Sequence, residues 1–138
     1  MCNSEQLRRF LGNIRNYWNR AGGVTQEQAA AIARREGFAF EIGRQPRFEN
    51  ARNSVVIGRG NLREGLVNRL ELAEEIQHGF DRATREASRA IRRGLSNEEF
   101  HAEVFQRIIR RYEAGGYQFL TAEDINALRQ IIRELRPR

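Results

Sequence analysis

The chain has 138 residues, of which 18 are acidic and 24 are basic, and its net charge is +6. Its length and its hydrophobic content of 40% indicate one folded domain with a modest core, which excludes an intrinsically disordered chain. No apolar run approaches membrane-spanning length, and the single cysteine, Cys2, excludes an internal disulfide, a zinc finger and a zinc-dependent deaminase.

Arginine supplies all 24 basic residues, and lysine is absent. One explanation is functional, because arginine pairs with carboxylate and phosphate through two hydrogen bonds, and a basic surface would bind nucleic acid or another polyanion. A second explanation is the codon bias of a GC-rich genome. A third is that a chain delivered into other cells avoids lysine, which is a target of modification. Composition leaves all three open.

Two helices are predicted in the first part of the chain. Apolar residues recur at helical spacing over residues 4–21, and Gly22 ends this first helix. Thr25 and Gln28 form a capping box that begins a second, short helix, which ends near Gly37.

The hydrophobic period then changes to that of strands. Residues 38–42 and 54–58 are short, rich in β-branched and aromatic side chains, and bounded by turn residues, so we expect them to pair. The polar connection over residues 43–53 contains Pro46 and is long for a hairpin. It is either a loop over a site or an ordinary surface excursion.

Helical patterns return in the second half. One covers residues 61–93, with a break expected near Asn68. The next begins at the capping box of Ser96 and runs to Gly115, and the last begins at the cap of Thr121. The sequence therefore predicts an α+β fold that is mostly helical, with about five helices and a small two-stranded β-sheet.

Three glutamates and one of only two histidines lie within residues 71–81. At 3.6 residues per turn, one helical face carries Glu71, Glu74, Glu75 and His78. The spacing Glu74-Glu75-x-x-His78 is the metallopeptidase pattern His-Glu-x-x-His with glutamate in place of the first histidine. We expect Glu74 and His78 to bind zinc or another divalent metal, and Glu75 to act as the general base.

A simpler interpretation explains the same charges without a site. The helix predicted over residues 61–93 is acidic in its first half and basic in its second half. The helix dipole favours this arrangement on any exposed helix, so the glutamates would then form an ordinary solvated face.

The second histidine, His101, lies near the centre of the apolar face of its predicted helix. A turn at Gly94 would fold this helix back against the one that carries the first histidine, which makes His101 the expected third ligand. Its alternative role is that of a core histidine. Glu98 and Glu103 are the other candidates for the third ligand, but Glu103 lies on the far side, where an i, i+4 pair with Arg107 explains it.

The motif Glu-x-x-His occurs twice, at Glu75-x-x-His78 and at Glu98-x-x-His101. Di-metal carboxylate bundles use such a repeat. We rank this arrangement lower, because those bundles need further inward carboxylates that the first and last predicted helices do not offer.

Residues 72–81, 101–109 and 119–125 together resemble the zincin-like C-terminal toxin domains of bacterial polymorphic (Rhs-type) toxins. The resemblance covers about the last half of the chain and rests on the Glu-Glu-x-x-His core. It implies that Glu75 is the base and His78 a ligand, and it offers Glu103 as the distal acidic ligand of that family.

The resemblance also implies a biological setting. A large secreted carrier would deliver the single toxin-type domain, residues 1–138, into the cytoplasm of a target cell, where it would meet its protein substrate. A cognate immunity protein would neutralise it. The polar start of the chain, which has no apolar segment behind its charges, agrees with export by a carrier and not by a signal of its own.

Three functions follow from these features. The first is a metal-dependent, zincin-like peptidase that acts as a secreted effector. The second is a nucleic-acid-directed toxin, either nuclease or binding module, in which a phosphate-tracking stripe is formed by Arg82, Arg85, Arg89 and Arg92. The third is a non-enzymatic interaction domain whose basic surface docks on an acidic partner.

Overall fold

The computed structural model describes residues 17–135, and within that range the chain forms five α-helices and three β-strands. In chain order they are α2 (Gln26–Arg35), β1 (Ala39–Gly43), β2 (Arg47–Glu49), β3 (Ser54–Gly58), α3 (Arg69–Ala83), α4 (Glu86–Arg92), α5 (Asn97–Glu113) and α6 (Ala122–Leu135). The predicted α+β class and mostly helical content are confirmed. Of the first predicted helix, residues 4–16 lie outside the described part of the chain, and residues 17–21 are not helical.

The sheet has three strands, in the order β1-β3-β2, so the prediction of two strands was wrong. Strand β3 pairs in parallel with β1 and antiparallel with β2. All five residues of β3 are buried, as expected for a central strand. The sequence did not reveal β2 because it is three residues long and directly follows Pro46, inside a polar stretch that otherwise has the composition of a loop.

The connection from β1 to β2 has to cross the end of β3, since β2 lies on the far side of that strand. It crosses at Gly58, where a Cβ atom would lie 3.0 Å from the Cδ of Pro46 and 2.9 Å from the Nδ2 of Asn61. Glycine therefore lets the connection pass closely over β3, which brings residues 46–50 toward the cleft described below.

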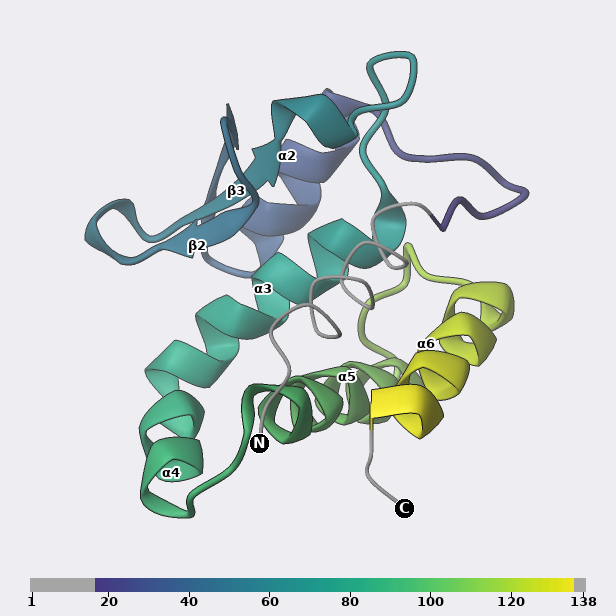
Figure 1. Cartoon of the computed structure of the whole chain (residues 1–138). Coiled ribbons are helices and arrows are strands. Elements are labelled where there is room, and N and C mark those ends of the chain that lie inside the picture. The colour runs from purple at the N-terminus through teal and green to yellow at the C-terminus, as the bar shows by residue number, and fades with distance from the viewer. Residues whose placement is uncertain (1–16, 136–138) are drawn as a thin grey trace.

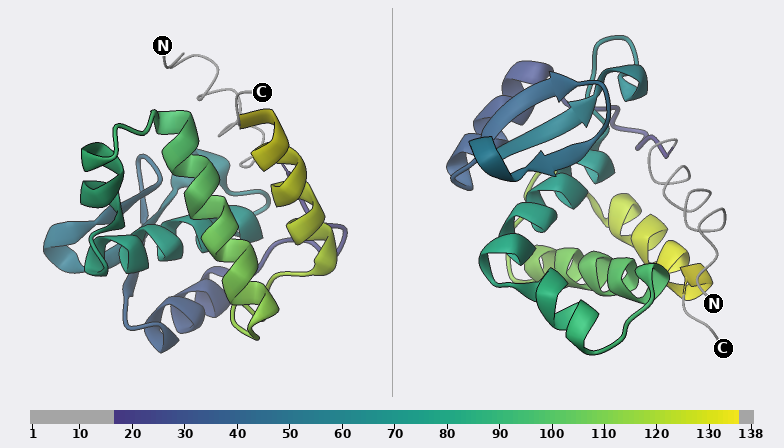
Figure 2. Two further views of the ribbon diagram at one scale, coloured as in Figure 1. Left: turned by 90° about the horizontal axis from the view of Figure 1, so that it is seen from below. Right: turned by 60° about the vertical axis from the view of Figure 1, so that its left-hand side comes forward.

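Helix α3 crosses the middle of the molecule, between the sheet with α2 on one side and α5 and α6 on the other (Figures 1 and 2). It contacts β2, β3, α4 and α5, and ten of its 15 residues are buried. The relative solvent-accessible surface area is only 0% for Glu71, 3% for Glu74 and 3% for Glu75. The interpretation of these glutamates as a solvated face was wrong, because α3 is covered on both sides.

The long helix predicted over residues 61–93 is divided. Helix α3 begins only after Asn68, near the expected break, and the side chain of Asn68 accepts hydrogen bonds from the N–H groups of Leu70 and Glu71 at 2.8 and 3.1 Å. The helix ends at Ala83, and Arg85 adopts the left-handed conformation with φ of 61° before α4 begins. Nothing in the local sequence signals this second break, since arginine rarely adopts a positive φ.

The caps predicted at Thr25, Ser96 and Thr121 are present, whereas the helix start predicted at Asn61 was wrong, because α3 begins only at Arg69. Capping boxes at Thr25 and Ser96 begin α2 and α5, and the N–H of Thr121 donates to Asp124 Oδ2 at 2.9 Å before α6. Each cap satisfies N–H groups that the first turn of a helix leaves without intrahelical partners.

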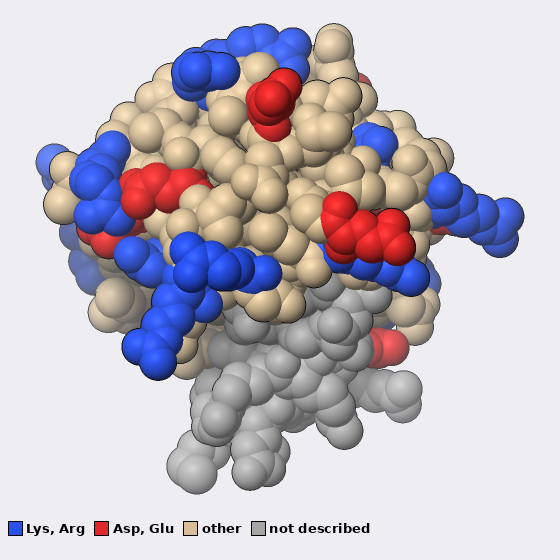
Figure 3. Space-filling view, turned by 90° about the horizontal axis from the view of Figure 1, so that it is seen from above, with Lys and Arg blue, Asp and Glu red and all other residues tan. Residues whose placement is uncertain are grey.

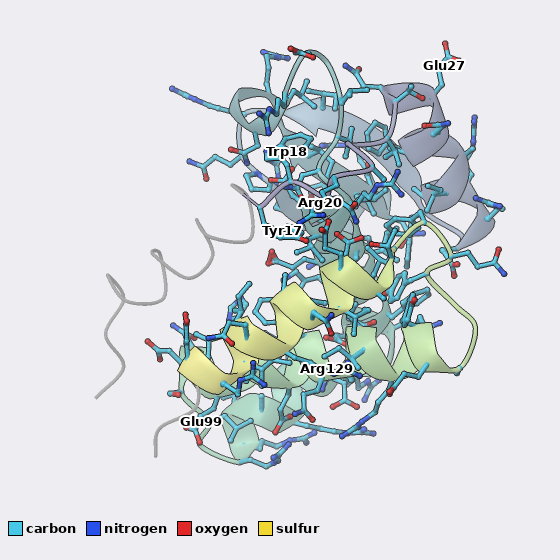
Figure 4. The ribbon with its side chains drawn as sticks, turned by 90° about the vertical axis from the view of Figure 1, so that its right-hand side faces the viewer. Tyr17, Trp18, Arg20, Glu27, Glu99 and Arg129 are labelled. Atoms are coloured by element: carbon cyan, nitrogen blue, oxygen red, sulfur yellow. The ribbon has the colours of Figure 1, made fainter. Side chains whose placement is uncertain are left out.

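The segment that precedes α2 ties two helix starts together. Tyr17, Trp18 and Arg20 lie between α6 and the upper layer (Figure 4), where Asn68 Nδ2 donates to the carbonyl oxygen of Tyr17 at 2.5 Å. The N–H of Arg20 donates to Glu123 Oε2 at 3.0 Å, which holds the segment on α6. Within residues 17–135, every helix is too short or too polar to serve as a transmembrane segment.

Candidate metal centre

An open cleft of about 580 Å³ lies between the β2 edge of the sheet, helix α3, helix α4 and the start of α5. Its base is formed by buried acidic side chains and a partly buried histidine of α3, and by the partly buried His101 of α5. Pro46, Arg47 and Phe48 form the wall on the side of the sheet. The connection over residues 43–53 therefore borders a cleft, one of the two alternatives that its sequence left open.

Glu74, His78 and His101 meet in this cleft. Each offers one potential ligand atom, and these three atoms lie within 4.8 Å of one another. Glu74 Oε2 is 3.8 Å from His78 Nε2, and the two imidazole rings are 5.8 Å apart between centroids. Tetrahedral zinc places its ligand atoms about 3.4 Å apart. Small side-chain rotations would therefore close the triad around a metal ion.

His101 is oriented by the helix that carries it. Its Nδ1 lies 2.8 Å from the carbonyl oxygen of Asn97, one turn earlier in α5. A carbonyl oxygen only accepts hydrogen bonds, so Nδ1 carries the proton and Nε2 keeps its lone pair. Metal-binding histidines are commonly oriented by such a bond from the second ring nitrogen. The sequence spacing placed His101 on the inner face but did not indicate this bond.

The two histidines have opposite electrostatic surroundings. Burial lowers the pKa of His78, but the hydrogen bond and charge of Glu74, with the charges of Glu75 and Asp81, outweigh burial and raise it to about 9. For His101 burial is the largest influence and lowers the pKa, against the bond to Asn97. Without metal at neutral pH, His78 is therefore a cation and His101 is neutral.

The four residues of the predicted polar face do not all reach the cleft. Glu75 lines it beside Glu74 and is 3% exposed, which places its carboxylate near the triad. Glu71 lies at the other end of the face, where its Oε1 accepts a hydrogen bond from Asn61 Nδ2 at 2.6 Å. Glu71 thus anchors the chain that leaves β3, a role its spacing on the helix did not reveal.

The other candidates for the third ligand lie elsewhere on α5. Glu103 receives two hydrogen bonds from Arg93, at 3.2 and 2.9 Å, and is 3.7 Å from Arg107, as its helical phase predicted. Glu98 is buried but does not line the cleft. Within residues 17–135, one group of ligating side chains is assembled, and the repeated Glu-x-x-His motif does not form a di-metal site.

A second buried polar group on α3 was not predicted. Asp81 accepts two hydrogen bonds from Arg107, at 2.9 and 2.8 Å, and a third from Gln77 Nε2 at 2.9 Å. The hydroxyl of Tyr117 donates to Gln77 Oε1 at 2.7 Å, and burial raises the pKa of Tyr117. No spacing in the sequence indicates this network, because its members come from three separate segments.

The arginines of the predicted stripe separate into two pairs. Arg82 and Arg85 line the cleft, whereas Arg89 and Arg92, on α4, do not. The left-handed turn at Arg85 ends α3, so the four residues do not continue one helical face. On the face shown in Figure 3, arginines are also scattered and several lie beside acidic side chains, without a continuous basic track.

Comparisons with known proteins give no match for this chain among protein-family models, curated proteins or solved structures. The resemblance to zincin-like toxin domains therefore stays a prediction from the sequence.

Proposed function

We propose that this chain is a metal-dependent hydrolase, with Glu74, His78 and His101 as ligands of zinc or another divalent ion and Glu75 as general base. The observation that carries the proposal is the approach of the three ligand atoms to within 4.8 Å of one another at the base of an open cleft. Three protein ligands leave the fourth position of a tetrahedral metal for water, which is the arrangement of catalytic zinc sites.

Each member of the site has a chemical task. A metal bound there would supply Lewis acidity and lower the pKa of a bound water. The buried carboxylate of Glu75 would accept a proton from the attacking water and pass it to the leaving group. The bond from His101 to the carbonyl of Asn97 would keep its Nε2 directed for ligation.

The position of β2 favours a peptide as the substrate. Strand β2 is at the edge of the sheet, and Arg47 and Phe48 border the cleft that holds the triad. Within the described part of the chain its ladder partner is β3, on one side. An extended peptide can add to such an edge by main-chain hydrogen bonds, with its scissile bond lying over the triad.

Metal analysis tests the proposal most directly. The protein purified without chelator, and apoprotein titrated with zinc, manganese, nickel and iron, should bind about one equivalent of one of these ions, as expected for a three-ligand site. His78→Ala should abolish this binding, while Glu99→Ala, which removes a side chain that caps α5 outside the cleft, should retain it. Absence of stoichiometric metal under all these conditions would contradict the proposal.

Hydrolysis tests the base. The metal-loaded protein should cleave an unfolded protein such as casein, and Glu75→Gln should reduce the rate by about 10²- to 10⁴-fold while metal stays bound. Glu27→Gln is the matched control, because Glu27 is exposed, projects outward from α2 (Figure 4) and does not line the cleft. Equal rates for Glu75→Gln and the control would remove Glu75 from the mechanism.

We also propose that the domain acts as a delivered toxin with a cognate immunity protein, on the basis of the sequence resemblance. Expression in bacterial cytoplasm should slow growth, and Glu75→Gln should relieve this effect at equal protein level. Toxicity that persists in the Glu75→Gln variant would indicate that the toxic effect arises from binding and not from hydrolysis. That result would favour the non-enzymatic alternative.

The nucleic-acid alternative has a weaker structural basis. Only Arg82 and Arg85 of its four arginines border the cleft. The affinity of a nuclease or binding module for nucleic acid should fall steeply as the salt concentration increases. The slope of this dependence is set by the number of phosphates that the protein neutralises. Such binding, abolished equally by Arg82→Gln and Arg89→Gln, would favour that alternative.

A further inference from the structure

The charges of the cleft are arranged by depth. The acidic residues of its lining, Glu74, Glu75 and Asp81, are at most 3% exposed. The arginines of its lining, in contrast, are all exposed: Arg47, Arg82 and Arg85. A molecule that enters the cleft therefore meets positive charge at the rim before it reaches the acidic base.

The rim arginines differ in how they are engaged. Arg47 lies 3.3 Å from Glu49, so its charge is partly compensated. Within residues 17–135, no acidic side chain lies within ion-pair distance of Arg82 or Arg85.

Neighbouring arginines do have such partners. Arg89 is 3.0 Å from Glu86, and Arg93 is 2.9 Å from Glu103. The cleft thus keeps two cations available at one end, next to the chain break at Arg85.

We propose that Arg82 and Arg85 make the site selective for peptides that carry acidic side chains close to the bond to be cut. This inference rests on the proposed hydrolase function and names its substrate class. A guanidinium offers a planar set of donors that binds a carboxylate through two hydrogen bonds, which gives both affinity and orientation. Two such groups beside the triad would recognise acidic residues on one side of the scissile bond.

A peptide fits these observations better than a nucleic acid. The cationic rim is short, since Arg89 and Arg92 do not line the cleft, and a phosphate-tracking groove needs a longer row of cations. The cleft is bordered on the opposite side by the edge strand β2, which suits an extended main chain.

Paired peptides measure the selectivity. Quenched fluorescent peptides carry either glutamate or glutamine, on one side or the other of the central bond. The metal-loaded protein should cleave them with different kcat/KM, with glutamate preferred on one of the two sides. Each of Arg82→Gln and Arg85→Gln should reduce this preference about tenfold, the amount expected for loss of one charge-assisted hydrogen bond. The double charge reversal, Arg82→Glu with Arg85→Glu, should favour lysine in the same position.

The control pair is Arg89→Gln with Arg92→Gln. It removes the same charge from the neighbouring α4 without altering the lining of the cleft, so the preference should be unchanged. An equal loss in the control pair would show that only the overall charge matters and would overturn the proposal. Equal cleavage of the glutamate and glutamine peptides by the parent protein would overturn it as well.

A binding measurement separates this inference from the hydrolase proposal. Fluorescence anisotropy of a labelled glutamate-rich peptide with Glu75→Gln protein should show tighter binding than its glutamine counterpart, weakened by salt and by Arg82→Gln. If the glutamate-rich peptide binds selectively but the metal-loaded parent protein cleaves no peptide, the hydrolase proposal is contradicted and the acidic-peptide site is retained. Preferential binding of a single-stranded RNA oligonucleotide would overturn the acidic-peptide site in favour of a nucleic-acid ligand.

Discussion

Helix α3 carries two groups of buried polar side chains, and the two differ in how their charge is compensated. In the first, Asp81 receives two hydrogen bonds from Arg107 and one from Gln77, so an arginine compensates a buried carboxylate. In the second, Glu74 lies beside His78 at the base of an open cleft. In the first group a permanent cation neutralises the carboxylate, so the group serves to hold α3 and α5 together as a brace. In the second group the negative charge of Glu74 is neutralised either by a proton on His78 or by a bound metal ion.

The comparison shows which buried charges are suited to chemistry. An arginine is permanently protonated and offers no lone pair, so it cannot become a metal ligand. A histidine can lose its proton and present a lone pair instead, so the Glu74 and His78 pair can exchange a proton for a metal. Four predictions test this division, from the largest expected effect on stability to the smallest.

Removal of Arg107 should be the most damaging change. Arg107→Ala leaves the 2% exposed Asp81 without its cation, and loss of one partner of a buried ion pair costs about 3–5 kcal/mol. Urea denaturation of the parent and the variant measures this loss. Arg110→Ala is the matched control, since Arg110 is exposed and its side chain donates a hydrogen bond only to Gln106 within the described residues, and it should cost about 0.5 kcal/mol or less. A small loss for Arg107→Ala would mean that the network is not a brace.

Without metal, the free energy of unfolding should depend on pH through His78. Its pKa in the folded protein is raised to about 9, from 6.5, so protonation favours the folded state. The contribution is fully present below pH 6.5 and is lost as the pH rises through about 9. The shift corresponds to on the order of 3 kcal/mol. Denaturation in chelator across this pH range checks it.

The control for this pH dependence is His78→Gln, which removes the titrating group and should flatten the decline between pH 6.5 and 9. The lowered pKa of His101 acts in the opposite window: stability is lost as the pH falls through 6.5, because the unfolded chain takes up that proton first. An unchanged decline in His78→Gln would assign the dependence to other groups.

The third prediction separates a ligand from a core residue at His101. His101→Phe should fold, because the ring packs near Phe100 and Phe105, with ring centroids 5.4 and 6.2 Å away. The parent should be stabilised by metal, by about 2.7 kcal/mol at a concentration one hundred times the dissociation constant, and the variant should lose this gain. Thermal melts with and without chelator measure both. If chelator leaves the melting temperature of the parent protein unchanged, His101 is a core residue and not a metal ligand.

The sequence predicted those parts of the site that depend on helical geometry alone. Spacings of three and four residues fix which side chains share a face, and the turn at Gly94 returns α5 toward α3, so Glu74, Glu75, His78 and His101 were found together. These are local rules, which hold wherever a helix forms.

The remainder depends on contacts between distant segments. Asp81 and Arg107 are 26 residues apart, and no periodicity predicts that they meet. Strand β2 forms because β3 provides a partner for a short, otherwise polar segment, and the burial of α3 arises because two layers cover it. The left-handed Arg85 is likewise contrary to the preference of its residue type, so only tertiary structure could reveal it.

The last prediction concerns Gly79, which lies in α3 between the two polar groups. A Cβ atom there would lie 2.7 Å from the rings of both Phe38 and Phe48, too close for an ordinary contact. Alanine favours a helix interior by about 1 kcal/mol over glycine, whereas overpacking against aromatic rings costs about 1–3 kcal/mol. Gly79→Ala should therefore destabilise the protein by up to about 2 kcal/mol, because rigid rings of the sheet layer must move.

The same substitution sharpens the comparison between the two groups. Phe48 also lines the cleft, so displacement of its ring should reduce metal-dependent peptide cleavage more than it weakens the hydrogen bonds between Arg107 and Asp81, in which Phe48 takes no part. Unfolding free energy and kcat/KM, measured on the same Gly79→Ala preparation, provide the two readouts. The control is Gly60→Ala, because a Cβ at Gly60 meets nothing within 4 Å and its φ is ordinary. If Gly79→Ala instead stabilises the protein, the rings of Phe38 and Phe48 can move away from α3 at little cost. Their close approach would then not determine the position of α3.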